Sequence, residues 1–344
     1  MEKTKKEIKK LALNLLVILI VLSIVLYFSL KDNFDEIVKY ISNMNIFWFI
    51  IAVFFYVLHR VLIGISSYNM LKINNEKIGL LKTIQINLII LFFHGITPFA
   101  GGGQPMEAYY LHKEKVGKTK SVNIVLQNFI IFQSALVIIS TLAVIYNQVF
   151  NLFPSDSFMR KLVMLGFIIN FVVLLASFVL SFGKRVNKFI SNKGIDFLAK
   201  IKIVKDKEKL KERFNDYINR FHNNALLLTK QKKKALLLLL LNIIAIAMSY
   251  TSSYFIAIGM GVSGLNLLQV IVITTYVMMI GSFVPIPGGT GGLEYGFMYF
   301  FGYYVTGGVL TAMMLVWRFV SYYLPMIIGA IALVLYRKKE KECV

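Results

Sequence analysis

Long apolar runs dominate the pattern of this sequence. Crossing the hydrocarbon core of a bilayer takes about 20 apolar residues, because each residue of an α-helix rises by about 1.5 Å. Six runs have the necessary length and contain no acidic residue, namely residues 11–30, 46–71, 121–146, 162–182, 235–258 and 309–336. The pattern therefore predicts an all-α polytopic membrane protein with about six spanning helices.

The basic residues between these runs predict the orientation of the chain. Segments 1–10, 72–82, 112–120, 183–234 and 337–344 contain 5, 3, 4, 16 and 4 Lys and Arg residues, whereas segments 31–45 and 147–161 contain two each. Short loops rich in Lys and Arg stay on the cytoplasmic side of a membrane. We expect a multi-pass protein of the cell membrane with both termini in the cytoplasm.

Two further apolar segments, 83–111 and 266–304, are interrupted at their centres by Pro and Gly. The orientation places both flanks of 83–111 in the cytoplasm and both flanks of 266–304 outside. Each segment must then enter and leave the membrane on one side, since the pieces after the breaks, 104–111 and 293–304, are too short to span it. We predict two re-entrant hairpins of opposite sidedness within a single integral membrane domain, 1–344.

The two broken segments share a motif, P-x-x-G-G-x4-E. The first copy consists of Pro98, Gly101, Gly102 and Glu107, and the second of Pro285, Gly288, Gly289 and Glu294, with Pro287 as a further break. A shared motif on segments of opposite sidedness predicts an inverted repeat, and transporters build substrate sites near the midplane of the membrane from interrupted helices in such repeats.

These motifs suggest a headgroup site. A glycine-rich turn that opens a short helix presents backbone N–H groups to a phosphate or carboxylate. We expect Glu107 and Glu294 to lie in the first turn of those helices, where they would bind a cationic headgroup or protons. The alternative is that each carboxylate only interacts favourably with the helix dipole. Gln104 and His94 flank the first turn, and His94 is either a proton relay or a hydrogen-bonded interior histidine.

Two arginines lie inside apolar runs, Arg60 in 46–71 and Arg318 in 309–336. A charge in a membrane segment is costly and usually has a partner or a function. We expect these arginines to pair with Glu107 or Glu294 or to contact a lipid phosphate. The alternative is that their side chains extend to the membrane interface.

Polar residues form stripes on two of the apolar runs. The stripes consist of Asn123, Gln127 and Ser134, with Asn128 and Gln133 beside them, and of Asn242, Ser249 and Ser253. Hydrogen bonds between helices are the expected role, with substrate contact as the alternative.

Segment 183–234 is the longest polar connection in the chain. Its apolar residues Leu210, Phe214, Tyr217 and Phe221 recur at helical spacing among Lys and Arg. This pattern is typical of an amphipathic helix on an anionic leaflet.

Composition narrows the class of protein. Of the 344 residues, 57% are hydrophobic, which is more than the roughly 45–50% of soluble domains, and the single cysteine, Cys343, excludes a disulfide scaffold. The formal net charge of +21 lies almost entirely in the predicted cytoplasmic loops, so no nucleic-acid partner is expected. The four histidines show no metal-ligand spacing, so we expect neither a metal nor a cofactor.

The two glycine-rich motifs and the Lys-rich loop resemble the transmembrane flippase region of the lysylphosphatidylglycerol synthase family, also called multiple peptide resistance factors. Long members of that family aminoacylate phosphatidylglycerol with a separate cytoplasmic domain and then move the cationic lipid outward, which gives resistance to cationic antimicrobial peptides. The chain ends at residue 344, directly after the last apolar run, so we expect it to lack the aminoacyl-transfer domain.

The resemblance implies a flippase that translocates an aminoacylated or other amphiphilic phospholipid, or a lipid-linked headgroup, between leaflets. Its expected partners are membrane phospholipids, anionic or aminoacylated, and the sequence allows a homo-oligomer. Two alternatives stay open: a phosphatidylglycerol lysyltransferase or its membrane component, and a secondary transporter of a small anion.

Overall fold

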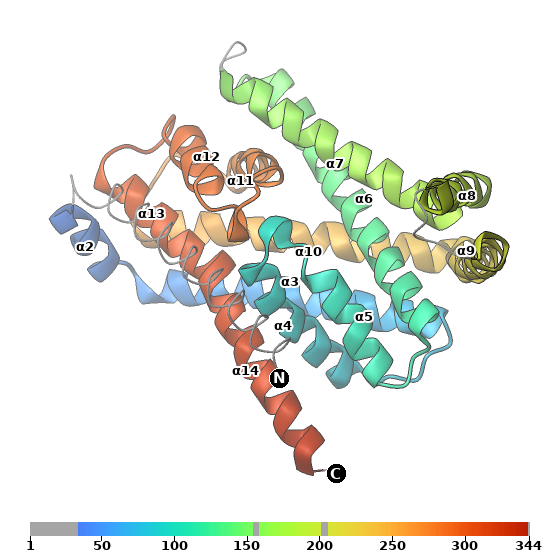
Figure 1. Ribbon diagram of the computed structural model, residues 1–344. Coiled ribbons are helices and arrows are strands. Elements are labelled where there is room, and N and C mark those ends of the chain that lie inside the picture. The colour runs from blue at the N-terminus through green and yellow to red at the C-terminus, as the bar shows by residue number, and fades with distance from the viewer. Residues whose placement is uncertain (1–33, 154–157, 201–205, 343–344) are drawn as a thin grey trace.

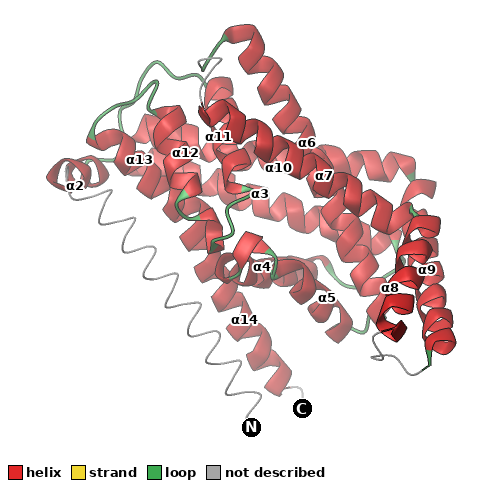
Figure 2. Cartoon of the chain, turned by 45° about the horizontal axis from the view of Figure 1, so that its top comes forward, coloured by secondary structure: helices red, strands yellow, loops and turns green. Residues whose placement is uncertain are grey.

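Five helices of the structure are long and apolar enough to cross a membrane. The computed structural model describes residues 34–153, 158–200 and 206–342, in which every regular element is a helix (Figures 1 and 2). The five are α3 (Ile46–Ile73), α6 (Lys118–Phe150), α7 (Phe158–Phe182), α10 (Lys232–Gly259) and the stretch Gly308–Lys338. They confirm the all-α polytopic membrane fold. The sixth predicted span, 11–30, lies outside the described residues.

The stretch from residue 308 is one helix with an irregular centre. It consists of α13 (Gly308–Arg318), the π-helical turn η3 (Phe319–Tyr323) and α14 (Leu324–Glu342). A π-turn widens the helix locally and is found frequently at functional sites. Here it follows directly after Arg318.

Both broken segments fold into helical hairpins. The first consists of α4 (Leu80–Ile96), the turn η1 (Pro98–Ala100) and α5 (Gly103–Lys113). The second consists of α11 (Leu267–Gly281), the turn η2 (Pro287–Gly289) and α12 (Gly292–Phe301). The helices after the turns have 11 and 10 residues, about half the length that a span requires. The re-entrant placement of the hairpins in the bilayer stays a prediction.

The turns η1 and η2, which we call the tips, contact each other although they are far apart in the sequence. Each tip is held in place by a long helix. Tip 1 follows α4, which packs along α14, and tip 2 is fixed by α13 through contacts described below. The helices therefore bring both copies of the motif to one place.

Close packing depends on small residues at helix crossings. A side chain at Gly329 of α14 would place its Cβ 2.6 Å from the backbone N of Phe92 and 2.7 Å from the carbonyl O of Leu88, so only glycine lets α14 approach α4 this closely. Small residues at helix interfaces are typical of membrane proteins.

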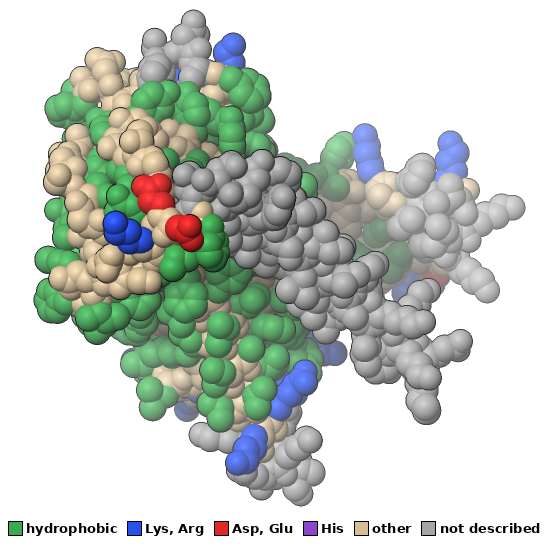
Figure 3. Space-filling view, turned by 90° about the vertical axis from the view of Figure 1, so that its left-hand side faces the viewer, with side chains coloured by type: hydrophobic (Ala, Val, Ile, Leu, Met, Phe, Trp, Pro, Cys, Tyr) green, Lys and Arg blue, Asp and Glu red, His purple; other side chains and the backbone are tan. Residues whose placement is uncertain are grey.

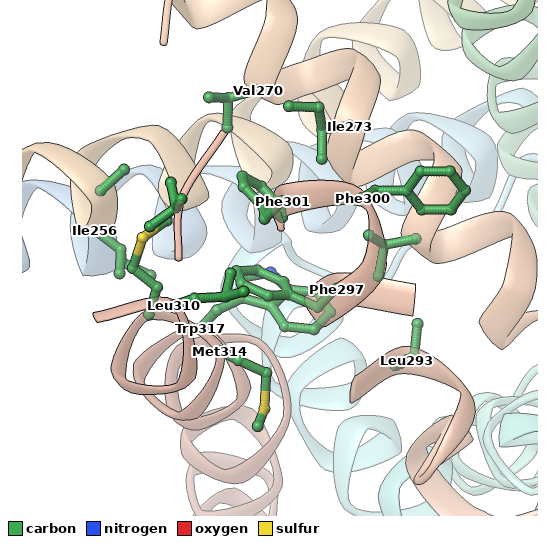
Figure 4. Packing of buried hydrophobic residues seen from close by; sticks show 14 of the residues in the cluster. Ile256, Val270, Ile273, Leu293, Phe297, Phe300, Phe301, Leu310, Met314 and Trp317 are labelled. Atoms are coloured by element: carbon green, nitrogen blue, oxygen red, sulfur yellow. The ribbon is translucent and has the colours of Figure 1, made fainter. Parts of the chain in front are cut away.

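A large buried cluster has most of its residues on α11, α12 and α13 and extends to neighbouring helices such as α10 (Figure 4). Phe297 stacks on Trp317 with a centroid distance of 5.0 Å, and Phe301 stacks on Phe297 at 4.2 Å. Glu294 lies one turn before Phe297, and Arg318 directly follows Trp317. The aromatic cluster therefore lies beside both charged side chains.

The outer surface of the bundle is apolar. Hydrophobic side chains spread over much of the face seen in Figure 3, with few charged ones among them. Large hydrophobic residues such as Phe54, Leu142 and Ile168 are more than half exposed. In water such a surface would cause aggregation, but in contact with lipid tails its exposure carries no free-energy penalty.

Two helices lie across the bundle. α8 (Lys184–Lys200) and α9 (Lys207–Lys230) are seen end-on in Figure 1, whereas α3, α7 and α10 are seen from the side. They lie at the end of the bundle where α7 ends and α10 begins. At the opposite end is α2 (Phe34–Ser42), whose Glu36 accepts a hydrogen bond from Gly308 N at 3.1 Å and caps α13.

Candidate functional site

A buried ion pair joins the second hairpin to α13. Arg318 Nε lies 2.7 Å from Glu294 Oε1, and the two side chains are only 4% and 8% exposed. Removing two charges from water is costly unless they neutralise each other, so their pairing explains how both are tolerated in apolar helices. Of the pairings expected from the sequence, this is the one that the described residues form.

The same arginine holds the backbone of tip 2. Arg318 Nη1 donates to the carbonyl O of Gly288 at 3.0 Å, and Nη2 donates to Thr290 Oγ1 at 3.3 Å. The Thr290 hydroxyl in turn donates to the carbonyl O of Pro287 at 2.8 Å. Three groups of one guanidinium therefore fix the turn and the first residues of α12.

Glu294 lies in the first turn of α12, as predicted. Its Oε2 accepts a hydrogen bond from Gly291 N at 2.7 Å. The carboxylate therefore accepts a hydrogen bond from one backbone N–H group at the positive end of this helix. The Glu294 carboxylate is thus an anion of the chain itself, and it interacts with both the positive end of α12 and Arg318.

Glu107 does not lie in the first turn of α5, and this prediction was wrong. Helix α5 begins at Gly103, so Glu107 lies just past its first turn. The side chain is buried, and Asn128 Nδ2 of α6 donates to its Oε1 at 3.2 Å. No cation forms an ion pair with Glu107 in the described part of the chain. The two glutamates of the motif thus have different environments.

The residues that are structurally equivalent in the two tips differ from those that the sequence motif aligns. Both turns begin at a proline, Pro98 in tip 1 and Pro287 in tip 2, rather than at Pro285, which is exposed. The next two residues have left-handed backbone angles in both tips, with φ of 53° for Phe99 and Ala100 and of 68° and 62° for Gly288 and Gly289. The match is therefore displaced by two residues, which explains why Glu107 and Glu294 are not equivalent.

Tip 1 holds its left-handed residues with local hydrogen bonds. Left-handed backbone angles are unfavourable for residues other than glycine, and such residues keep them only where the surrounding structure imposes them. Gly102 N donates to Thr97 Oγ1 at 2.9 Å, and Gly101 N donates to the carbonyl O of Pro98 at 3.0 Å. His94 Nδ1 lies 2.5 Å from the carbonyl O of Ala100.

His94 therefore has a structural partner. Its ring lies against Gly103, where any Cβ would overlap it. Gln104 follows at the second position of α5 and is half-buried. These residues shape the start of α5, at which no side chain caps the helix.

Arg60 is held by a tyrosine. Its Nε lies 3.1 Å from the Tyr56 hydroxyl, Nη2 also contacts this oxygen, and the guanidinium carbon lies 5.1 Å from the centroid of the Tyr56 ring. The Tyr56 hydroxyl donates to the carbonyl O of Ser321 at 3.1 Å. Arg60 is half-buried and forms no ion pair with an acidic residue among those described.

The π-turn η3 connects these parts. Tyr322 donates a hydrogen bond to the carbonyl O of Gly95 at 2.8 Å, and the guanidinium of Arg318 lies 4.6 Å from the Tyr322 ring centroid. Ser321 in the same turn accepts the bond from Tyr56. This turn therefore contacts α3, the end of α4 and, through Arg318, tip 2.

Sequence reasoning missed three of these residues: Tyr56, Tyr322 and Thr290. Tyr56 precedes Arg60 by four residues and Tyr322 follows Arg318 by four, a spacing that places side chains next to each other on a helix. Searching for aromatic partners at this spacing would have found both. Thr290 lies inside the glycine-rich motif, where its hydroxyl is the only polar side chain before Glu294.

The amide side chains of the polar stripes form hydrogen bonds between helices, as expected, whereas Ser134 bonds within its own helix. Asn123 Nδ2 donates to the carbonyl O of Phe221 at 2.9 Å, and Asn242 Nδ2 donates to Ser66 Oγ at 2.8 Å. Gln133 Nε2 donates to Asn170 Oδ1 at 2.8 Å. These bonds join α6 to α9 and α7, and α10 to α3, away from the tips.

Comparison with known proteins assigns the chain to a family. A family model described as the lysylphosphatidylglycerol synthase TM region matches residues 14–329, which is most of the chain. No curated protein matches the chain.

Proposed function

The chain belongs to the family of the lysylphosphatidylglycerol synthase TM region, as its motifs predicted, and from this premise we propose that it moves a phospholipid with a cationic or aminoacylated headgroup between leaflets. In bacteria that modify their lipids, such movement would contribute to resistance against cationic peptides. A gradient of the lipid or of an ion would drive it.

The observation that carries the proposal is the difference between the two carboxylates. Glu294 is neutralised by Arg318 at 2.7 Å, whereas Glu107 is buried with an amide, that of Asn128, as its hydrogen-bonding partner. A buried carboxylate without a counter-charge in a membrane helix is costly and indicates a substrate or proton pathway. We assign the cationic part of the headgroup to Glu107.

The start of α5 supports a phosphate next to that carboxylate. Its first residues, Gly103 and Gln104, follow a glycine-rich turn, and the helix has no side-chain cap that would compete with an anion. Glu107 follows Gly103 by four residues, about 6 Å along the helix axis. A headgroup with a phosphate and an ammonium a few bonds apart matches this arrangement.

The paired charges have a different role in this proposal. Arg318 and Glu294 hold tip 2 to α13, and Tyr322 of the π-turn η3 bonds to the end of α4. They position the site rather than contact the headgroup. Arg60, which is half-buried beside Tyr56, is available to a lipid phosphate at another point of the path.

The test is lipid movement in proteoliposomes made with fluorescent phosphatidylglycerol and lysyl-phosphatidylglycerol. Glu107→Gln keeps the volume and can still accept the Asn128 hydrogen bond, so we expect a folded protein that moves the lysylated lipid at least about tenfold more slowly, since loss of a charged contact amounts to about 1.4 kcal/mol or more.

Glu212→Gln, at an exposed position of α9, is the matched control and should leave the rate unchanged. A rate for Glu107→Gln equal to that of the unmodified chain would contradict the role of this carboxylate. Uptake of small anions without movement of lipid would contradict the proposed function itself.

A further inference from the structure

The helices α8 and α9 contact each other through charged side chains and border a polar cleft. Toward α9, α8 presents polar groups: Asp196 Oδ1 lies 2.7 Å from both Lys207 Nζ and Lys211 Nζ. An open cleft of about 720 Å³ between the two helices is lined by polar side chains, among them Asn192 and Asn215. The two helices thus contact each other through polar and charged side chains at these positions.

Three apolar side chains in the first half of α8 are exposed, whereas Ile195 in its second half is buried. Val186, Phe189 and Ile190 are 46%, 59% and 62% exposed, and they form one stripe at helical spacing. Arg185 and Lys193 border this stripe, and both are exposed. Lys193 Nζ lies 4.4 Å from the Phe189 ring centroid, so the basic and aromatic groups share one face.

The start of α8 is fixed at the end of a spanning helix. A single residue, Gly183, separates α7 from α8. Asn187 Nδ2 donates to the carbonyl O of Val179 at 3.2 Å and of Leu180 at 2.8 Å, which are among the last carbonyls of α7. These bonds hold the bend through which α8 turns across the bundle (Figure 1). The exposed stripe of α8 therefore begins next to the end of α7, a helix long and apolar enough to span a membrane.

We propose that the exposed face of α8, formed by Arg185, Val186, Phe189, Ile190 and Lys193, lies on the surface of the membrane leaflet next to it and binds anionic phospholipids there. The apolar stripe inserts between headgroups, and the bordering basic side chains contact their phosphates. Segment 183–234 contains 16 basic and five acidic residues, which complements an anionic leaflet. This contact is independent of the lipid that the hairpins move.

The experiment uses the full chain in lipid nanodiscs, with Cys343→Ser as the background. An environment-sensitive fluorophore is attached to Val186→Cys in α8. The control carries the same label at Glu208→Cys, an exposed polar position of α9. With brominated acyl chains in the disc, we expect strong quenching of the label at position 186 and none at position 208. Replacing phosphatidylglycerol with phosphatidylcholine should reduce the quenching at position 186.

A charge variant tests the role of the basic border. Lys193→Gln should lower the ratio of docked to free α8 about fivefold in phosphatidylglycerol discs, and it should have no effect in phosphatidylcholine discs. Lys209→Gln, which removes a charge from the α8–α9 cleft, is the matched control and should have no effect in either.

A label at position 186 that is as accessible to aqueous iodide as the label at position 208 would overturn the proposal. Protection of position 186 by added tRNA or by another protein, instead of by lipid, would overturn it too. The labelled Val186→Cys chain keeps Lys193, so these outcomes do not depend on whether Lys193→Gln folds.

Discussion

At the scale of single residues, the environment of each charge decides its role more than its place in a motif. Glu294 and Arg318 are 8% and 4% exposed and satisfy each other, whereas Glu107 is equally buried without such a partner. In an apolar helix a charge that loses its partner costs more than the pair as a whole contributes. The pair therefore predicts a clear pattern of stability.

We predict that Arg318→Met lowers the free energy of unfolding by about 3–5 kcal/mol, because it leaves Glu294 buried without a counter-charge. The double variant Arg318→Met, Glu294→Gln should recover part of this loss. Reversible unfolding in detergent, arranged as a double-mutant cycle, measures both. Purely additive losses would show that the two side chains do not interact.

At the scale of elements, the hairpins depend on close contacts with the long helices. Gly329 lets α14 approach the backbone of α4, and the π-turn η3 carries Tyr322 to the end of α4. Neither contact involves residues near each other in the sequence. The position of tip 1 therefore depends on α14.

We predict that Gly329→Ala destabilises the protein by about 1–3 kcal/mol, since the added Cβ meets backbone atoms of α4 that can move only with the helix. Gly194→Ala is the matched control, because a Cβ at this helical position meets nothing within 4 Å. It should be neutral or stabilising by up to about 1 kcal/mol. Equal thermal stability of the two variants in detergent would argue against close α4–α14 packing.

The α8–α9 contact has a predictable response to pH. Hydrogen bonds from Lys207 and then from Lys211 hold the pKa of the Asp196 carboxyl below its ordinary value. A carboxyl with a lowered pKa stabilises the fold above its unfolded pKa of about 3.9, and this contribution disappears as the pH falls through the folded pKa.

The protection that this contact gives to the α8 amides against hydrogen exchange should consequently be constant between about pH 8 and pH 5 and be lost only under stronger acid, after correction for intrinsic rates. Asp196→Asn should show faster α8 exchange already at neutral pH, with α3 unchanged as the internal control. Loss of protection in α8 between about pH 8 and pH 6 would contradict this assignment.

At the scale of the whole molecule, the many basic residues of α8 and α9 lie at one end of an apolar bundle. The Lys-rich helices α8 and α9 lie where α7 ends and α10 begins, and α2 with its capping Glu36 lies at the other end (Figure 1). Because basic loops remain in the cytoplasm, this asymmetry predicts the orientation of the entire chain.

Orientation is tested by cysteine accessibility in the Cys343→Ser background, in intact cells. We expect a membrane-impermeant maleimide to label Ser263→Cys, in the exposed loop after α10, and to label Glu208→Cys in α9 only after the membrane is permeabilised. Labelling of both positions in intact cells, or of position 208 alone, would contradict the predicted orientation.

The sequence by itself determined the helices and their breaks, because apolar length and the positions of Pro and Gly act locally. The long apolar runs within the described residues became helices, and both interrupted segments became hairpins with short second helices. The family was readable for the same reason, since its motifs are the breaks themselves. The tertiary structure decided which charges meet.

Glu294 pairs with Arg318 and Glu107 with Asn128 because α13 packs against α12 and α6 packs against α5, and no local rule specifies such neighbours. The structure also shifted the repeat by two residues, since only packing selects which of Pro285 and Pro287 begins the turn. Apolar pattern thus predicts the elements, while the electrostatics of the site depends on contacts between helices that are distant in the chain.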